Sequence, residues 1–127
     1  MNTDAALSIA KCKTGIGAVL RDHNGDVLLF GVHSLDGVLE PDIAEAKAIL
    51  FGLTLAMESG FFSLFLESDA ASCLNSRVNF FHVPRNANRI AHSLTKLSFD
   101  FDYPAVWLEE FPSCISSLIV EDACSIL

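Results

Sequence analysis

The stretch FFSLFLESD, residues 61–69, is an apolar run that ends in Glu67-Ser68-Asp69. Because Phe61 to Leu66 is nearly all apolar, it predicts a strand that is buried on both faces of a sheet. Asp69 follows at the carboxyl end of this strand, where open α/β sheets place their functional sites. Asp69 can also cap a short helix over Ala70–Asn75, and the two roles are compatible.

Two further acids fall on predicted elements. Asp4 lies within or at the edge of a predicted strand over Ala5–Ala10. Glu45 lies in a predicted helix over Asp42–Ser59, in which apolar residues recur at helical spacing and Gly60 provides a stop. The recurring residues are Ala46, Leu50, Leu53 and Met57. We expect Asp42 to cap this helix, so Glu45 has the alternative role of completing a capping box.

The remaining elements follow from short patterns. Gly15–Arg21 and Asp26–His33 are two strands joined at Asn24-Gly25, a strong hairpin signal because both turn positions tolerate positive φ. Val78–Val83 predicts a strand within Arg77–Pro84. Asn86–Phe99 predicts a helix capped by Asn86, with apolar residues inward at Ile90, Leu94 and Leu97. The order is a β-meander followed by αβαβα, which is typical of an α/β fold with a mixed sheet and helices on its faces.

The length of 127 residues and the composition fit a single folded domain. We expect this domain to span residues 1–99 and to be followed by an acidic appendage over residues 100–127. No segment reaches the roughly 20 apolar residues of a membrane helix. The N-terminal residues lack a basic secretory signal, so we expect an intracellular protein of the nucleus or cytoplasm. The four cysteines, Cys12, Cys73, Cys114 and Cys124, show no CxxC pairing and are expected to be reduced.

The net charge of −8 is unevenly distributed along the chain. Six of the 16 acids lie at or after Asp100, where there is no Lys or Arg. Residues 76–99 hold Arg77, Arg85, Arg89 and Lys96 and no acid. Such a basic segment suits modest contact with phosphates. An ordinary solvated face is the other interpretation, and charge alone favours it.

Several short motifs follow one another in an order that is typical of one family. They are Asn2-Thr3-Asp4-Ala5, residues 15–22 (GIGAVLRD), Ala44-Glu45-Ala46, Glu67-Ser68-Asp69, His82-Val83-Pro84-Arg85, residues 88–94 (NRIAHSL) and residues 106–112 (VWLEEFP). Each motif alone is weak. Together they resemble the ribonuclease-H-like (RNase H type-1) domain of plant proteins related to non-LTR retroelement reverse transcriptases.

This resemblance implies a five-stranded mixed sheet and metal-dependent cleavage of the RNA strand of RNA–DNA hybrids. It implies that Asp4, Glu45 and Asp69 bind Mg²⁺ or Mn²⁺. Hard cations prefer carboxylate oxygens, and a metal pair can activate water and stabilise the leaving oxygen. Candidate nucleic-acid contacts are Arg77, Arg85, Asn88 and Arg89.

The chain also departs from the family pattern. His92 stands where the helix motif usually carries a fourth acid, and imidazole is a poor ligand for Mg²⁺. Some plant relatives also carry His here, and His92 is a candidate for orienting a water or contacting the scissile phosphate. The helical insert between the Glu-Ser-Asp and His-Val-Pro-Arg motifs is short, and we expect a truncated or mispredicted gene product, or a degenerate copy. Three functions remain open: a nuclease, a nucleic-acid-binding domain without turnover, and a poorly folding remnant. His33 and His82 are expected to be structural.

Overall fold

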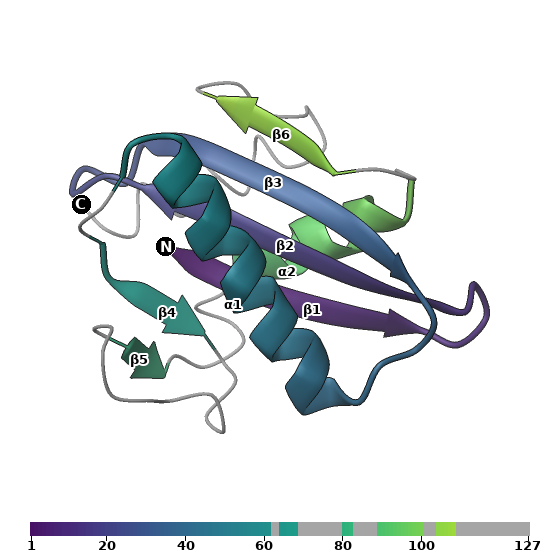
Figure 1. The fold of residues 1–127 in the computed structure, drawn as a ribbon. Coiled ribbons are helices and arrows are strands. Elements are labelled where there is room, and N and C mark those ends of the chain that lie inside the picture. Colours follow the sequence, from purple (N-terminus) through teal and green to yellow (C-terminus); the bar gives the residue numbers. More distant parts are fainter. Residues whose placement is uncertain (62–63, 69–79, 83–88, 101–103, 109–127) are drawn as a thin grey trace.

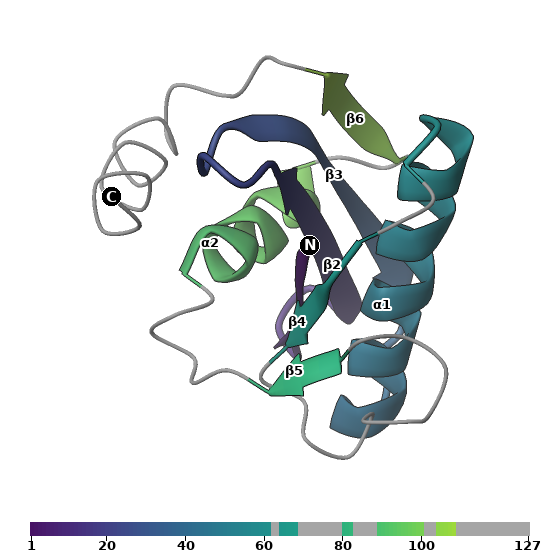
Figure 2. The same cartoon turned by 90° about the vertical axis from the view of Figure 1, so that its left-hand side faces the viewer.

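The computed structural model describes residues 1–61, 64–68, 80–82, 89–100 and 104–108, and these form three layers. A mixed sheet lies between helix α1 on one face and helix α2 on the other (Figures 1 and 2). The elements are β1 (Asn2–Ser8), β2 (Lys13–Arg21), β3 (Val27–Asp36), α1 (Pro41–Glu58), β4 (Leu66–Ser68), β5 (Phe80–His82), α2 (Arg89–Leu97), the 3-10 helix η3 (Ser98–Asp100) and β6 (Ala105–Leu108). No helix among these residues is long and apolar enough to cross a membrane.

The strand order of the sheet is β5-β4-β1-β2-β3-β6. Strands β1, β2 and β3 form an antiparallel meander, while β4 and β5 continue the sheet in parallel beyond β1. This confirms the predicted α/β fold with a mixed sheet. The described residues contain six strands rather than five, because β6 pairs antiparallel with β3 at the far edge. The sequence pattern at Ala105–Leu108 did not predict this strand.

The hairpin between β2 and β3 is confirmed, but its turn differs from the expected one. Of the two residues Asn24 and Gly25, only Gly25 has a positive φ, of 86°. Asn24 has a negative φ, unlike the residue at that position in the expected two-residue turn. The Gly25 N–H donates to the Asp22 carbonyl oxygen at 3.1 Å, and Asp22 Oδ1 accepts from the backbone N–H groups of Asn24 and Asp26. A longer turn with one left-handed glycine results, as in three-residue hairpin loops.

Helix α1 begins one residue earlier than expected. Its N-cap is Glu40, without a side-chain cap hydrogen bond, and Pro41 occupies the first turn. The prediction that Asp42 is the cap was therefore wrong, and Asp42 is an acid of the first turn. Proline suits this position because its fixed φ is helical and its missing N–H has no intrahelical partner. At the other end Gly60 has a φ of 89° and follows the C-cap Ser59, as predicted.

The buried face of α1 is lined by small residues. Ala44, Ala48, Gly52 and Ala56 recur every four residues and are buried, together with Ile49 and Leu55. A Cβ added at Gly52 would lie 2.9 Å from the Ala18 Cβ, so the helix packs closely on β2. The apolar residues that identified the helix lie elsewhere, since Leu50 and Met57 are 65% and 60% exposed.

The opposite face of the sheet packs against α2. Phe30 and Val32 of β3 form a cluster there with Ala91 of α2 and Trp107 of β6. Helix α2 and η3 also approach β2 closely at Gly15, where an added Cβ would lie 2.6 Å from the Thr95 carbonyl oxygen. This contact leaves no space for a side chain at position 15 and fixes the distance between α2 and the sheet.

Strand β4 is shorter and later than predicted. It spans only Leu66–Ser68, whereas Phe61, Leu64 and Phe65 are not part of a strand. Phe61 and Leu64 pack against the core beneath α1 without belonging to a strand, whereas Phe65 is 60% exposed. The predicted strand in Arg77–Pro84 is β5, and Ala70–Asn75 and Asn86 lie outside the described residues.

Candidate active site

Asp4 is in the middle of β1 and pairs with Gly17 of β2. Its side chain is fully buried, at 0% exposure. Burying a carboxylate costs free energy unless other groups bind it. Asp4 Oδ2 lies 2.8 Å from Nδ1 of His92, on the face of the sheet that α2 covers. The fold therefore brings together two residues that the sequence analysis named as candidates.

His92 connects this buried carboxylate to the surface. Its side chain is 29% exposed, whereas that of Asp4 is not exposed. The backbone around His92 is held by two further hydrogen bonds along α2 and η3. Thr95 Oγ1 donates to the His92 carbonyl oxygen at 2.7 Å, and Ser98 Oγ donates to the Thr95 carbonyl oxygen. Together with the close contact at Gly15, these bonds position the imidazole over β1.

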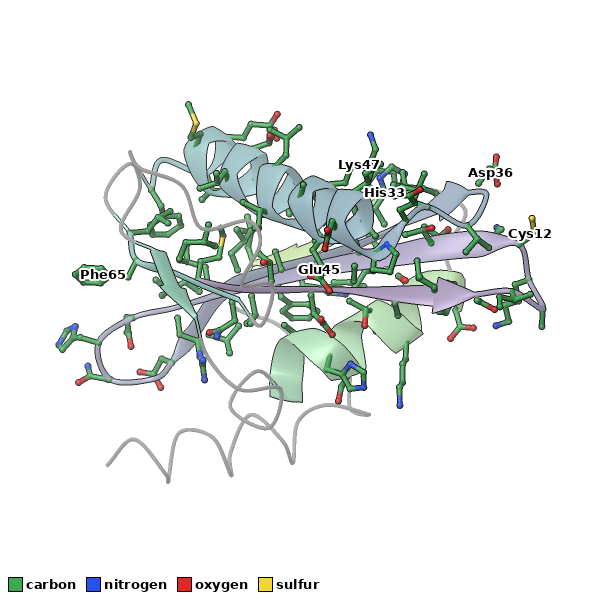
Figure 3. The ribbon with its side chains drawn as sticks, turned by 90° about the horizontal axis from the view of Figure 1, so that it is seen from below. Cys12, His33, Asp36, Glu45, Lys47 and Phe65 are labelled. Carbon is green, nitrogen blue, oxygen red and sulfur yellow. The ribbon has the colours of Figure 1, made fainter. Side chains whose placement is uncertain are left out.

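Glu45 approaches from the other helix. It is half-buried on α1, next to the fully buried Ala44. Figure 3 shows Glu45 projecting from α1 toward the sheet. Glu45 and His92 both line a cavity of about 430 Å³. The other lining residues are Ala5, Ala6, Leu7, Pro41, Ala44 and Lys96.

The cavity forms where β1 extends past the end of β4. These two strands pair at Asn2 and Glu67, and β4 ends at Ser68. Residues Ala5 to Leu7 of β1 therefore have no strand beside them on this side within the described part of the chain. Side chains from the helices on opposite faces of the sheet can meet around this free edge, which explains how α1 and α2 line one cavity.

The other predicted site residues are only partly within the described chain. Asp69, Arg77, Arg85 and Asn88 lie outside it. Arg89 is the first residue of α2. Lys96 lines the cavity although the sequence analysis did not place it among the site residues. Its signal in the sequence was its position four residues after His92, which is one helical turn.

The donor atoms present suit a hard metal ion but do not complete a site. Asp4 and Glu45 offer carboxylate oxygens, which Mg²⁺ prefers. However, the part of the chain that the structure describes contains no group of three His, Cys, Asp or Glu side chains that could hold a metal ion. One oxygen of Asp4 is also bound to His92.

His33 lies away from this cavity. It is half-buried on β3, and its ring centroid is 6.0 Å from that of Phe51 on α1. Burial lowers the pKa of His33 below the ordinary value of 6.5, because the charged imidazolium loses solvation. This environment agrees with the structural role expected for His33.

Comparisons with known proteins give the family and the fold. Residues 2–77 match the model of the family described as reverse transcriptase-like. Two solved structures are similar. RNase H1 from the halophilic archaeon Halobacterium salinarum NRC-1 has a TM-score of 0.66 and 20% identity, covering 78% of this chain and 95% of that one. LC11-RNase H1, solved in complex with an RNA/DNA hybrid, has a TM-score of 0.62 and 18% identity, covering 78% and 94%.

No curated protein sequence matches the chain. The family model spans more than half of the 127 residues. Both solved structures share the three-layer arrangement of a mixed sheet between helices, which is the ribonuclease H fold. This chain therefore belongs to the reverse transcriptase-like family and has a ribonuclease H fold.

Proposed function

We propose that this protein binds RNA–DNA hybrids and cleaves their RNA strand with the help of a divalent metal ion. The observation that carries the proposal is the contact between Asp4 and His92, beside a cavity that Glu45 also lines. A buried carboxylate on β1 beside the cavity, with a second carboxylate from α1 in the cavity wall, suits metal-assisted hydrolysis. The fold neighbour solved with an RNA/DNA hybrid supports the choice of substrate.

Asp4, Glu45 and Asp69 would hold Mg²⁺, with Mn²⁺ as the alternative ion. We include Asp69 because β4 lies beside β1 and ends at Ser68, one residue before it. When bound, such ions lower the pKa of a water and stabilise the leaving oxygen. His92 would act by holding Asp4 Oδ2 in one orientation, as outer partners of metal ligands do. The nucleic acid would be contacted by Arg77, Arg85, Asn88 and Arg89. We also propose that the protein descends from a plant retroelement.

A second function is favoured by the same contact. His92 contacts an oxygen of Asp4 that would otherwise be available to bind a metal ion. Imidazole itself is a poor ligand for Mg²⁺. In this alternative the protein binds hybrids without cleaving them. The two functions differ in turnover but share the substrate.

Cleavage of an end-labelled RNA–DNA hybrid with Mg²⁺ or Mn²⁺ tests the proposal. The variants Asp69→Asn and Glu45→Gln, which remove one charge each, serve as controls. Circular dichroism first establishes that each sample is folded. Metal-dependent cleavage that both variants lose supports the nuclease. Hybrid binding without cleavage by folded wild-type protein selects the second function, and a folded protein that does neither refutes both.

A further inference from the structure

Lys96 is an exposed cation in the wall of the candidate active-site cavity. It follows His92 by four residues on α2, so the two side chains lie on one face of the helix. The rise of about 1.5 Å per residue separates their backbone positions by roughly 6 Å along the axis. The ammonium group can therefore reach a ligand that extends past His92 along the cavity.

The ammonium of Lys96 forms no hydrogen bond or ion pair with the residues that the structure describes. Two other cations among the described residues are engaged. Lys11 lies 5.3 Å from the centroid of the Phe99 ring, and Arg21 donates to Asn2 Oδ1 at 2.5 Å. Lys47 is also exposed, but Figure 3 shows it on the side of α1 that faces away from the sheet. Lys96 is the cation among the described residues that lines the cavity.

The charges around the cavity make this position important. Asp4 and Glu45 are acidic and the whole chain carries a net charge of −8, so the net electrostatic effect on an approaching polyanion is repulsive. A lysine provides a compact, flexible positive charge that contacts phosphate without demanding a fixed geometry. A single cation at the cavity wall would lower the electrostatic cost of bringing a nucleic-acid backbone to the carboxylates.

We propose that Lys96 binds a backbone phosphate of the strand that occupies the cavity, next to the phosphate that faces Asp4 and Glu45. This inference rests on the proposed function, because it names the contact that holds the same substrate. Lys96 would be a positioning residue for the nucleic acid, and it is separate from the arginines proposed above.

The test measures affinity for a fluorescently labelled RNA–DNA hybrid by anisotropy, with Ca²⁺ replacing Mg²⁺ so that the probe stays intact. Titrations at several salt concentrations between about 50 and 200 mM give the slope of log K against log salt. The variants are Lys96→Gln, Lys96→Arg and the matched control Lys47→Gln, which removes the same charge from the outer side of α1. Thermal unfolding establishes that all of them fold.

We expect Lys96→Gln to weaken binding about three- to tenfold at low salt and to reduce the slope by about 0.9, the loss of one phosphate contact. Lys96→Arg should retain the slope, and Lys47→Gln should match wild type. Equal effects of Lys96→Gln and Lys47→Gln would overturn the inference. The loss of one positive charge, regardless of its position, would then explain both results. If folded wild-type protein binds no hybrid, the proposed function fails and the inference fails with it.

Discussion

His92 Nδ1 lies 2.8 Å from Asp4 Oδ2, a contact between residues 88 positions apart in the chain. It joins helix α2 to the strand at the middle of the sheet and satisfies part of a fully buried carboxylate. The same contact matters for stability, because it pairs a buried carboxylate. It also matters for the proposed function, because it involves an oxygen of Asp4 that could bind a metal ion. The two effects can be separated by substitutions at His92.

Replacing His92 by Ala should lower the free energy of unfolding by about 1–3 kcal/mol, because a buried carboxylate loses a hydrogen-bond partner. Urea unfolding measures this change. Ser93→Ala, one residue along the same helix, is the control and should change stability by less than about 0.5 kcal/mol. A double-mutant cycle with Asp4→Asn should show coupling between positions 4 and 92, and additive effects would contradict the contact.

Replacing His92 by Asp should make the stability of the protein depend more strongly on Mg²⁺ than that of wild type. Two carboxylates at the Asp4–His92 contact repel each other without metal, which lowers the unfolding temperature. Added Mg²⁺ should reverse this loss, with about 2.7 kcal/mol of stabilisation at 100 times the dissociation constant. Thermal unfolding with and without Mg²⁺ measures the effect, and Ca²⁺ is a useful comparison ion.

The same variant, His92→Asp, can also be tested in the cleavage assay. If the missing fourth acid limits the wild-type protein, His92→Asp should bind Mg²⁺ on the order of tenfold more tightly and show more Mg²⁺-dependent cleavage. If cleavage does not rise while Mg²⁺ stabilises the fold, the fourth acid is not the limiting defect.

The glycine at position 15 should be intolerant of any side chain. A Cβ there meets the Thr95 carbonyl oxygen at 2.6 Å, and backbone cannot yield as a flexible side chain does. We expect Gly15→Ala to cost about 3 kcal/mol. Gly37→Ala is the comparison, since a Cβ there meets nothing within 4 Å but the φ of 89° is unfavourable. It should cost about 1–2 kcal/mol, and the order of the two costs tests the close packing of α2.

A matched pair of leucines tests which face of α1 is buried. Leu55 is 9% exposed and packs against the sheet, whereas Leu50 is 65% exposed. Leu55→Ala should cost about 2–5 kcal/mol, because it leaves a cavity in the core. Leu50→Ala should change stability by less than about 0.5 kcal/mol. Chemical denaturation of both variants decides the question, and equal costs would mean that the helix is rotated.

The pH dependence of stability should carry a contribution from His33. Its pKa in the folded state is below the ordinary value of 6.5 because burial disfavours the charged ring. Above about pH 6.5 the contribution of His33 to the free energy of unfolding is fully present. As the pH falls below 6.5, the unfolded chain binds a proton before the folded protein does, so the free energy of unfolding decreases until the pH reaches the lower pKa of the folded state. Urea unfolding between about pH 5 and 8 should show a shallower decline for His33→Gln than for wild type. Parallel curves would contradict the buried environment of His33.

Local patterns predicted the elements that depend on local interactions. The β2–β3 hairpin and the end of α1 follow from glycines that adopt positive φ, at Gly25 and Gly60. The start of α1 was misplaced because Asp42 suited a capping box, although Pro41 marks the first turn. The face of α1 was not predictable from its large apolar residues, since these occur on several sides. Small residues recur every four positions on the buried face, and the close approach of Gly52 to Ala18 shows how tightly that face packs on β2.

Features that depend on distant parts of the chain were predictable only in part. The order of the motifs identified Asp4 and His92, but their hydrogen bond follows from the packing of α2 on β2. Phe61 and Leu64 pack against the core beside α1, and β4 begins only at Leu66, a difference that the apolar pattern of the sequence cannot reveal. Strand β6 has four residues, two of them exposed, and exists through its pairing with β3.

Trp107 is the single tryptophan of the chain, and it lies on β6, stacked on the buried ring of Phe30 with centroids 4.7 Å apart. Fluorescence excited selectively in this indole therefore reports on one edge of the molecule. Two strands, β3 and β2, separate that edge from β1 and the candidate active site. Emission changes during unfolding would time the release of β6, whereas binding at the cavity should leave the emission spectrum unchanged.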